Sequence, residues 1–109
     1  MENDFPPAAL GFLRVAAVSP ELRVADVRYN TRLTIEAMEQ AAARGCRLVA
    51  FPEMGLTSYS CADLFYQALL LRAAREALVE VAEAAGRMGL AAIVGLPLQA
   101  GGRMYNTAA

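Results

Sequence analysis

Three short apolar segments, separated by two long amphipathic ones, constrain the fold of this chain more than any other feature. The apolar segments are residues 12–18, 48–51 and 91–96, and each ends at proline or at Ser-Pro. Segments of this kind are typical of strands that are covered on both faces of a sheet. The longer segments, roughly 26–43 and 63–88, repeat apolar side chains at helical spacing. This alternation predicts an α/β fold with parallel strands joined by crossover helices.

The ends of these segments carry their own signals. Gly45 and Gly89 would end the two helices, and Asp63 would cap the start of the second one. Residues 100–103 predict a turn, so the last strand, at 104–109, would form a hairpin with the third. The predicted order is β-α-β-α-β-β, in one partial domain that spans residues 1–109.

We expect the second layer of this fold to be incomplete. Two helices can cover one face of the sheet, whereas the strands are apolar on both faces. The other face would be covered by sequence outside these residues or by another chain, which favours a homo-oligomer. Residues 1–10 are predicted to be a loose lead-in, because Pro6-Pro7 blocks regular hydrogen bonding.

Composition excludes several classes of function. All ten basic residues are Arg, and the absence of His and Lys rules out a Ser-His-Asp triad or a Schiff base within these residues. Carboxylates and two isolated thiols are a poor ligand set, so we expect no metal site. The net charge is −1 without a basic run, which argues against binding to nucleic acid or a membrane surface. With neither a signal peptide nor a membrane-spanning run, and with cysteines typical of reduced thiols, we predict a cytoplasmic protein.

Glu53 is the main candidate for chemistry. In α/β sheets, ligands bind beyond the carboxyl ends of the strands, and Glu53 directly follows the second strand and Pro52 at that edge. A carboxylate in such apolar surroundings is expected to lose hydration, which suits a general base. The alternative is an ordinary loop carboxylate or a helix cap, and position alone leaves both open.

The remaining candidates have simpler explanations. Cys61 precedes a helix, but no His is available as its base, so we expect a small, partly buried residue. Cys46 precedes a strand at the opposite edge and is predicted to be part of the core. Tyr59 could line a substrate pocket or pack against its own loop, and the sequence does not choose between the two.

Several ordered motifs resemble the nitrilase (carbon–nitrogen hydrolase) superfamily. Residues 51–60, Phe-Pro-Glu-Met-Gly-Leu-Thr-Ser-Tyr-Ser, look like the segment that carries its catalytic glutamate, and residues 94–98 and 105–108 fit its third and fourth strands. Ser58 stands where the family usually has Gly, and Ser tolerates a positive φ less readily. The subgroup of glutaminase domains of glutamine-dependent NAD+ synthetases is indicated by residues 61–65, with 11–17, 24–26 and 29–30 upstream.

This resemblance implies a nitrilase-like α-β-β-α sandwich and a Glu-Lys-Cys triad. Glu53 would take the thiol proton, the Cys would attack the amide carbon of glutamine, and the Lys would stabilise the oxyanion. The chain has no Lys, and neither Cys46 nor Cys61 matches the nucleophile, so we expect these residues alone to be inactive. No cofactor is implied here; ATP with Mg²⁺ would act in a synthetase domain that these residues do not include.

Two other hypotheses remain open. The chain could be a non-catalytic, self-associating module, because of its uncovered sheet face. It could also be a fragment of another nitrilase-superfamily amidase that acts on small amides. Residues 61–65 favour the synthetase.

Overall fold

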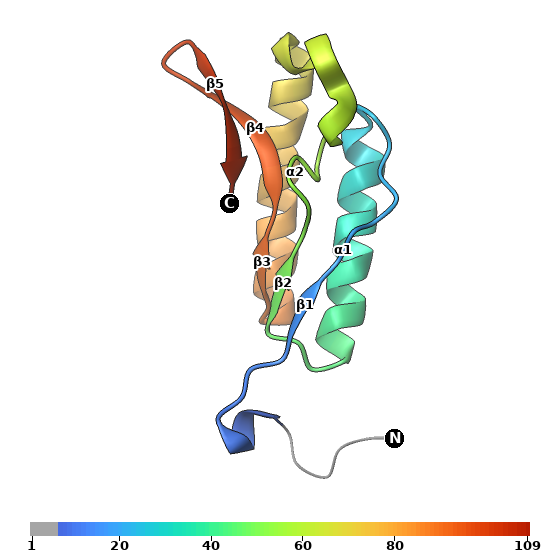
Figure 1. Cartoon of the computed structure of the whole chain (residues 1–109), viewed down its shortest axis with the longest axis vertical. Helices are drawn as coiled ribbons and strands as arrows, with labels where there is room; N and C mark the ends of the chain where they lie inside the picture. The colour runs from blue at the N-terminus through green and yellow to red at the C-terminus, as the bar shows by residue number, and fades with distance from the viewer. Residues whose placement is uncertain (1–6) are drawn as a thin grey trace.

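The computed structural model describes residues 7–109 and has the predicted alternation of strands and helices, with one strand more than predicted after the second α-helix (Figure 1). A 3-10 helix, η1, precedes the first strand, and a second, η2, precedes the long helix. The elements in chain order are η1 (Pro7–Leu10), β1 (Val15–Ala17), α1 (Val27–Ala43), β2 (Leu48–Ala50), η2 (Tyr59–Tyr66), α2 (Ala68–Met88), β3 (Ala91–Ile93), β4 (Gly95–Ala100) and β5 (Arg103–Ala108).

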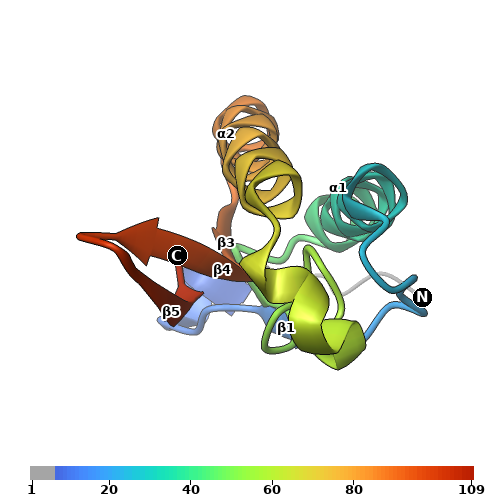
Figure 2. The same ribbon diagram turned by 90° about the horizontal axis from the view of Figure 1, so that it is seen from above.

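The first three strands form the predicted parallel sheet. β2 lies between β1 and β3 and pairs in parallel with both. Both helices lie on the same side of this sheet (Figure 2). Val49 of β2 faces them and is fully buried, whereas Val15 of β1 is 56% exposed and Ile93 of β3 is 42% exposed. The described residues therefore leave the other face of the sheet open, as expected.

The core lies between the sheet and the two helices. α1 begins where predicted, because the Asp26 carboxylate accepts a hydrogen bond from the backbone N–H of Tyr29 (3.1 Å). α2 ends at Gly89, whose φ of +63° is the left-handed conformation that glycine adopts readily. Residues from both helices and from the central strand make up the core, including Met38, Ala41, Val49, Ala74, Val81 and Ala84.

The start of the long helix differs from the prediction. α2 begins at Ala68, and Asp63 is an exposed residue of η2 rather than its N-cap. Within η2, Ala62 has φ +50° and ψ −126°, which no continuous helix accommodates. The cap position is Gln67, whose backbone is extended. Helical spacing of apolar residues continues across this break, so periodicity alone overestimates the helix by about one turn.

The predicted third strand is divided in two. β3 ends at Ile93, and Val94 instead exchanges two backbone hydrogen bonds with Ala109, both 2.9 Å, which starts the antiparallel β4–β5 hairpin. The sequence predicts that Pro97 ends the strand, but Pro97 lies inside β4, opposite Asn106. Hydrogen-bonded pairs alternate along an antiparallel ladder, so the position of Pro97 needs no N–H toward β5. The hairpin itself is confirmed.

The amino-terminal expectation is met only in part. Residues 1–6 lie outside the described part of the chain, and Pro7–Leu10 form a 3-10 turn rather than a loose segment. β1 is also shorter than its apolar run. Its pairing with β2 begins only at Val15, and residues 12–14 before it are exposed. In residues 7–109, no helix is both long enough and apolar enough to cross a membrane.

Candidate active site

Glu53 lies immediately beyond the carboxyl end of β2, where the sequence places it. The Phe51 N–H donates to the Ile93 carbonyl (2.9 Å), which continues the sheet by one residue before the chain turns. A tight turn follows, in which the Gly55 N–H donates to the Pro52 carbonyl (3.0 Å). The Glu53 backbone is thus held between the end of the central strand and a closed turn.

The β4–β5 hairpin contacts this turn directly. The Leu56 N–H donates to the Gly95 carbonyl (3.1 Å), and Gly95 packs against the backbone of the Glu53 turn. A Cβ atom at Gly95 would lie 2.4 Å from the Met54 nitrogen and 2.8 Å from the Pro52 oxygen. No real Cβ tolerates such distances to backbone atoms, so only glycine allows this approach.

A side chain of the same hairpin contacts the carboxylate itself. The Asn106 Nδ2 group of β5 donates a hydrogen bond to Oε1 of Glu53. Sequence reasoning missed Asn106, which it treated only as part of the fourth strand. The available signal was a polar amide in the predicted hairpin, but its partner could not be identified without the hairpin register.

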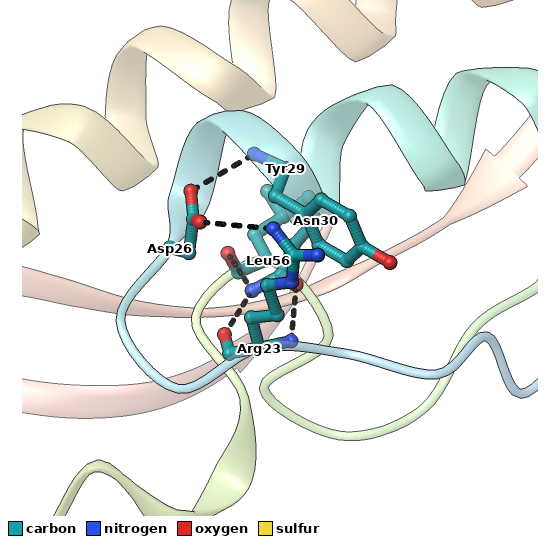
Figure 3. Close-up of polar contacts among 5 residues, drawn as sticks. All are labelled: Arg23, Asp26, Tyr29, Asn30 and Leu56. Atoms are coloured by element: carbon teal, nitrogen blue, oxygen red, sulfur yellow. Dashed lines mark hydrogen bonds and ion pairs between the residues drawn. The ribbon is translucent and has the colours of Figure 1, made fainter.

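A buried asparagine of α1 holds the far end of the turn (Figure 3). Asn30 is fully buried, and its Nδ2 group donates to the carbonyls of Arg23 (2.8 Å) and Leu56 (3.2 Å). Its Oδ1 atom accepts from the Arg23 N–H (2.8 Å). One side chain thus joins the loop after β1, the start of α1 and the loop after β2. The loop after β1 is also bonded directly to the loop after β2, because the Ala25 N–H donates to the Thr57 carbonyl (2.8 Å).

The segment after Glu53 is held in an unusual backbone conformation. Met54, Ser58 and Ala62 all have positive φ although none is glycine. Ser58, at the position where the nitrilase superfamily usually has Gly, has φ +72° and ψ +146°. This region is almost exclusive to glycine and costs about 1–3 kcal/mol for other residues. Strain of this kind persists only where the surrounding contacts over-determine the backbone.

The exposure of Glu53 differs from expectation. The sequence predicts a carboxylate that loses hydration, yet Glu53 is exposed in the described structure. An apolar strand predicts apolar surroundings at its end, but the described residues do not cover the Glu53 side chain there. Tyr59 is also 67% exposed, so most of its side chain does not pack against its own loop.

Both cysteines are part of the interior. Cys46 is 8% exposed and belongs to the core, as predicted. Cys61 is 2% exposed, more buried than expected, and its thiol contacts the carbonyls of Thr57 (3.0 Å) and Ser58 (3.3 Å). Neither thiol contacts Glu53. The described residues therefore place an accessible carboxylate at this edge of the sheet, with neither thiol in contact with it.

Within residues 7–109, His, Cys, Asp and Glu side chains nowhere gather in groups of three or more that could hold a metal ion.

Comparison with known proteins places this arrangement in a family. Residues 14–109 match the Carbon-nitrogen hydrolase family. The chain belongs to this family. Carbon–nitrogen hydrolase membership confirms the resemblance drawn from the motifs around Glu53.

Similar proteins from several bacteria share one name. The chain is 32% identical over 98 residues to a "Glutamine-dependent NAD(+) synthetase" of Mycobacterium leprae, covering 90% of this chain and 14% of the relative. It is 35% identical over 98 residues to a protein of the same name from Xylella fastidiosa (strain Temecula1), covering 89% of this chain and 18% of that protein. The chain thus spans less than a fifth of the curated relatives it matches.

Solved structures confirm the nitrilase-like α/β fold. A glutamine-dependent NAD(+) synthetase from Cytophaga hutchinsonii superposes with a TM-score of 0.75 at 25% identity, over 88% of this chain and 16% of that one. An amidase from Nesterenkonia sp. superposes with a TM-score of 0.76 at 23% identity, over 88% of this chain and 36% of that one. The second likeness shows the shared carbon–nitrogen hydrolase fold alone.

Proposed function

We propose that these residues are part of the glutaminase domain of a glutamine-dependent NAD+ synthetase, with Glu53 as general base. The observation that carries the proposal is the placement of Glu53: a carboxylate at the carboxyl end of the central strand, with its backbone fixed on both sides and one oxygen bonded to Asn106. The shared name of the curated relatives supports the choice of glutamine as the amide.

In the proposed reaction, Glu53 accepts the proton of a cysteine thiol, whose sulfur attacks the side-chain amide carbon of glutamine. A Lys stabilises the negative oxygen of the tetrahedral intermediate. The C–N bond then breaks, ammonia leaves with the transferred proton, and water releases glutamate from the thioester. The ammonia would be used by a separate synthetase domain, with ATP and Mg²⁺, to amidate nicotinic acid adenine dinucleotide.

The triad is not complete within these residues. The sequence has no Lys, and both of its thiols are buried away from Glu53. We propose that the Lys and the nucleophile follow in the same reading frame, and that residues 1–109 alone do not hydrolyse glutamine. Tyr59, exposed just beyond the Glu53 turn, is proposed to contact the substrate in the complete domain. The cytoplasmic location also stays a prediction.

The test compares three proteins: the complete reading frame, its Glu53→Gln variant, and the 109-residue chain. General-base catalysis contributes about 100- to 10,000-fold, so Glu53→Gln should lower ammonia release from glutamine by at least that lower factor. The 109-residue chain should release none. Glu21→Gln, at another exposed carboxylate, is the matched control and should retain full activity.

Three results would contradict the proposal. The first is unrelated sequence after codon 109 that lacks a Lys and a later Cys. The second is turnover of glutamine by the 109-residue chain. The third is a Glu53→Gln variant with normal activity. Release of ammonia from small aliphatic amides but not from glutamine would instead favour another amidase of the superfamily.

The open sheet face favours a second candidate, a self-associating module without catalysis. Val15 and Ile93 on this face are about half exposed. Apolar side chains on a contiguous face mark an interaction surface, and identical faces pair readily around a two-fold axis. A homo-oligomer is compatible with either candidate. A monomer by light scattering at micromolar concentration would argue against the second.

A further inference from the structure

We infer that Asn106 is a positioning residue for Glu53, and that it leaves Oε2 of the carboxylate as the atom that accepts the proton. This inference rests on the proposed function for its catalytic consequence. The contact between the two side chains stands independently of that function. Three features of the structure support it.

The first feature is the contact itself. Nδ2 of Asn106 donates to Oε1 of Glu53, and Glu53 forms no ion pair within residues 7–109. A carboxylate has two oxygens, and each can accept hydrogen bonds. Because the Asn106 amide occupies one lone pair of Oε1 and cannot release its proton, Oε2 is the oxygen with both lone pairs free to accept one.

The second feature is that the backbone determines where Asn106 lies. Asn106 pairs with Pro97, two residues beyond Gly95, and Gly95 is in direct backbone contact with the Glu53 turn. The Gly95 carbonyl also accepts from the Leu56 N–H (3.1 Å). The hairpin is therefore bonded to the turn at one point and reaches the carboxylate at a second. Two points of contact define the orientation of Asn106 relative to Glu53.

The third feature is the exposure of both side chains. Glu53 and Asn106 are exposed, so their bond contributes little to the packing of the core. Exposed glutamates have several rotamers, and ordering such a side chain has an entropic cost. A base must be oriented before it can accept a proton efficiently, and small misplacements cost up to about 100-fold in rate. The bond from Asn106 supplies this order at the carboxylate without burying it.

The kinetic test uses the complete reading frame with Asn106→Asp and Asn106→Ala. Asn106→Asp has nearly the same shape but replaces the donor by a negative charge. Both variants should lower kcat for glutamine hydrolysis by about 10- to 100-fold, because the base is less well placed. The KM for glutamine should change less than twofold, and Asn106→Asp should be the slower variant. Gln99→Ala, which removes an exposed amide from the same hairpin, is the control and should match the wild type.

A spectroscopic test is independent of activity. In the 109-residue chain, the side-chain NH₂ resonances of Asn106 should shift in Glu53→Gln and remain in place in Glu21→Gln. Unchanged resonances in Glu53→Gln would overturn the inference while leaving the proposed function intact. Equal kcat in Asn106→Asp, Asn106→Ala and wild type would do the same.

The opposite failure is separable. Normal ammonia release by Glu53→Gln would overturn the proposed function and, with it, the positioning role of Asn106, even where the resonances shift. A drop in kcat for Asn106→Asp that Asn106→Ala does not share would assign the effect to the added charge and also overturn the inference.

Discussion

The amide of Asn106 lies against the carboxylate of Glu53, although 53 residues separate the two along the chain. The bond joins the last strand of the hairpin to the end of the central strand. Together with the close approach at Gly95 and the brace from Asn30, it makes the Glu53 turn a point where three separate segments meet. Each of these contacts leads to a measurable expectation.

Gly95→Ala should destabilise the chain and displace the Glu53 turn. The added Cβ would meet backbone atoms at 2.4 and 2.8 Å, and backbone cannot move aside as a flexible side chain can. Overpacking of this kind costs about 1–3 kcal/mol, measured as a lower free energy of unfolding in urea. Gly86→Ala is the matched control, because Gly86 lies in α2 with nothing within 4 Å of its added Cβ. It should stabilise the protein by about 0.5–1 kcal/mol.

Asn30→Ala should lower the free energy of unfolding by about 2–4 kcal/mol, because it leaves several backbone groups around a fully buried side chain without partners. Hydrogen exchange should also rise in the loops around Arg23 and Leu56. Gln40→Ala, at an exposed position of the same helix, should change stability by less than about 0.5 kcal/mol. Equal stability of the two variants would contradict the bracing role of Asn30.

Ser58→Gly should stabilise the protein. At φ +72° and ψ +146°, serine is in a conformation that glycine adopts without steric cost. Relief of this strain should exceed the greater entropy of glycine in the unfolded chain and raise the free energy of unfolding by about 1 kcal/mol. Ser60→Gly is the control, because Ser60 has φ −88° and gains nothing. A loss of stability in both variants would show that Ser58 is not strained.

Val15→Glu should suppress self-association without unfolding the chain. Val15 is 56% exposed on the open sheet face, where a charge would have to be buried in any face-to-face dimer. Val79→Glu is closely matched, since Val79 is 58% exposed but lies on α2. Light scattering across a concentration series should show association for wild type and Val79→Glu, and little for Val15→Glu. Equal association of all three proteins would place the contact elsewhere.

Local sequence determined much of this architecture. The Asp26 cap and the apolar stripe specify α1, and short apolar runs specify β2 and its neighbours, because these signals act within a few residues. The position of Glu53 at the end of β2 follows from the same pattern. The sequence left the conformation at Ser58 open, because Ser there tolerates a positive φ less readily than Gly; the structure has φ +72° at this residue.

Tertiary structure decided the rest. Residues 91–98 are apolar throughout, but the chain leaves the parallel sheet at Val94, whose backbone forms two hydrogen bonds with Ala109 instead. The exposure of Glu53 depends on which faces are covered, and apolar composition does not reveal this. Its bond to Asn106 depends on the hairpin register. Periodicity reports the preferences of neighbouring residues, whereas contacts between distant segments arise only when the whole chain packs.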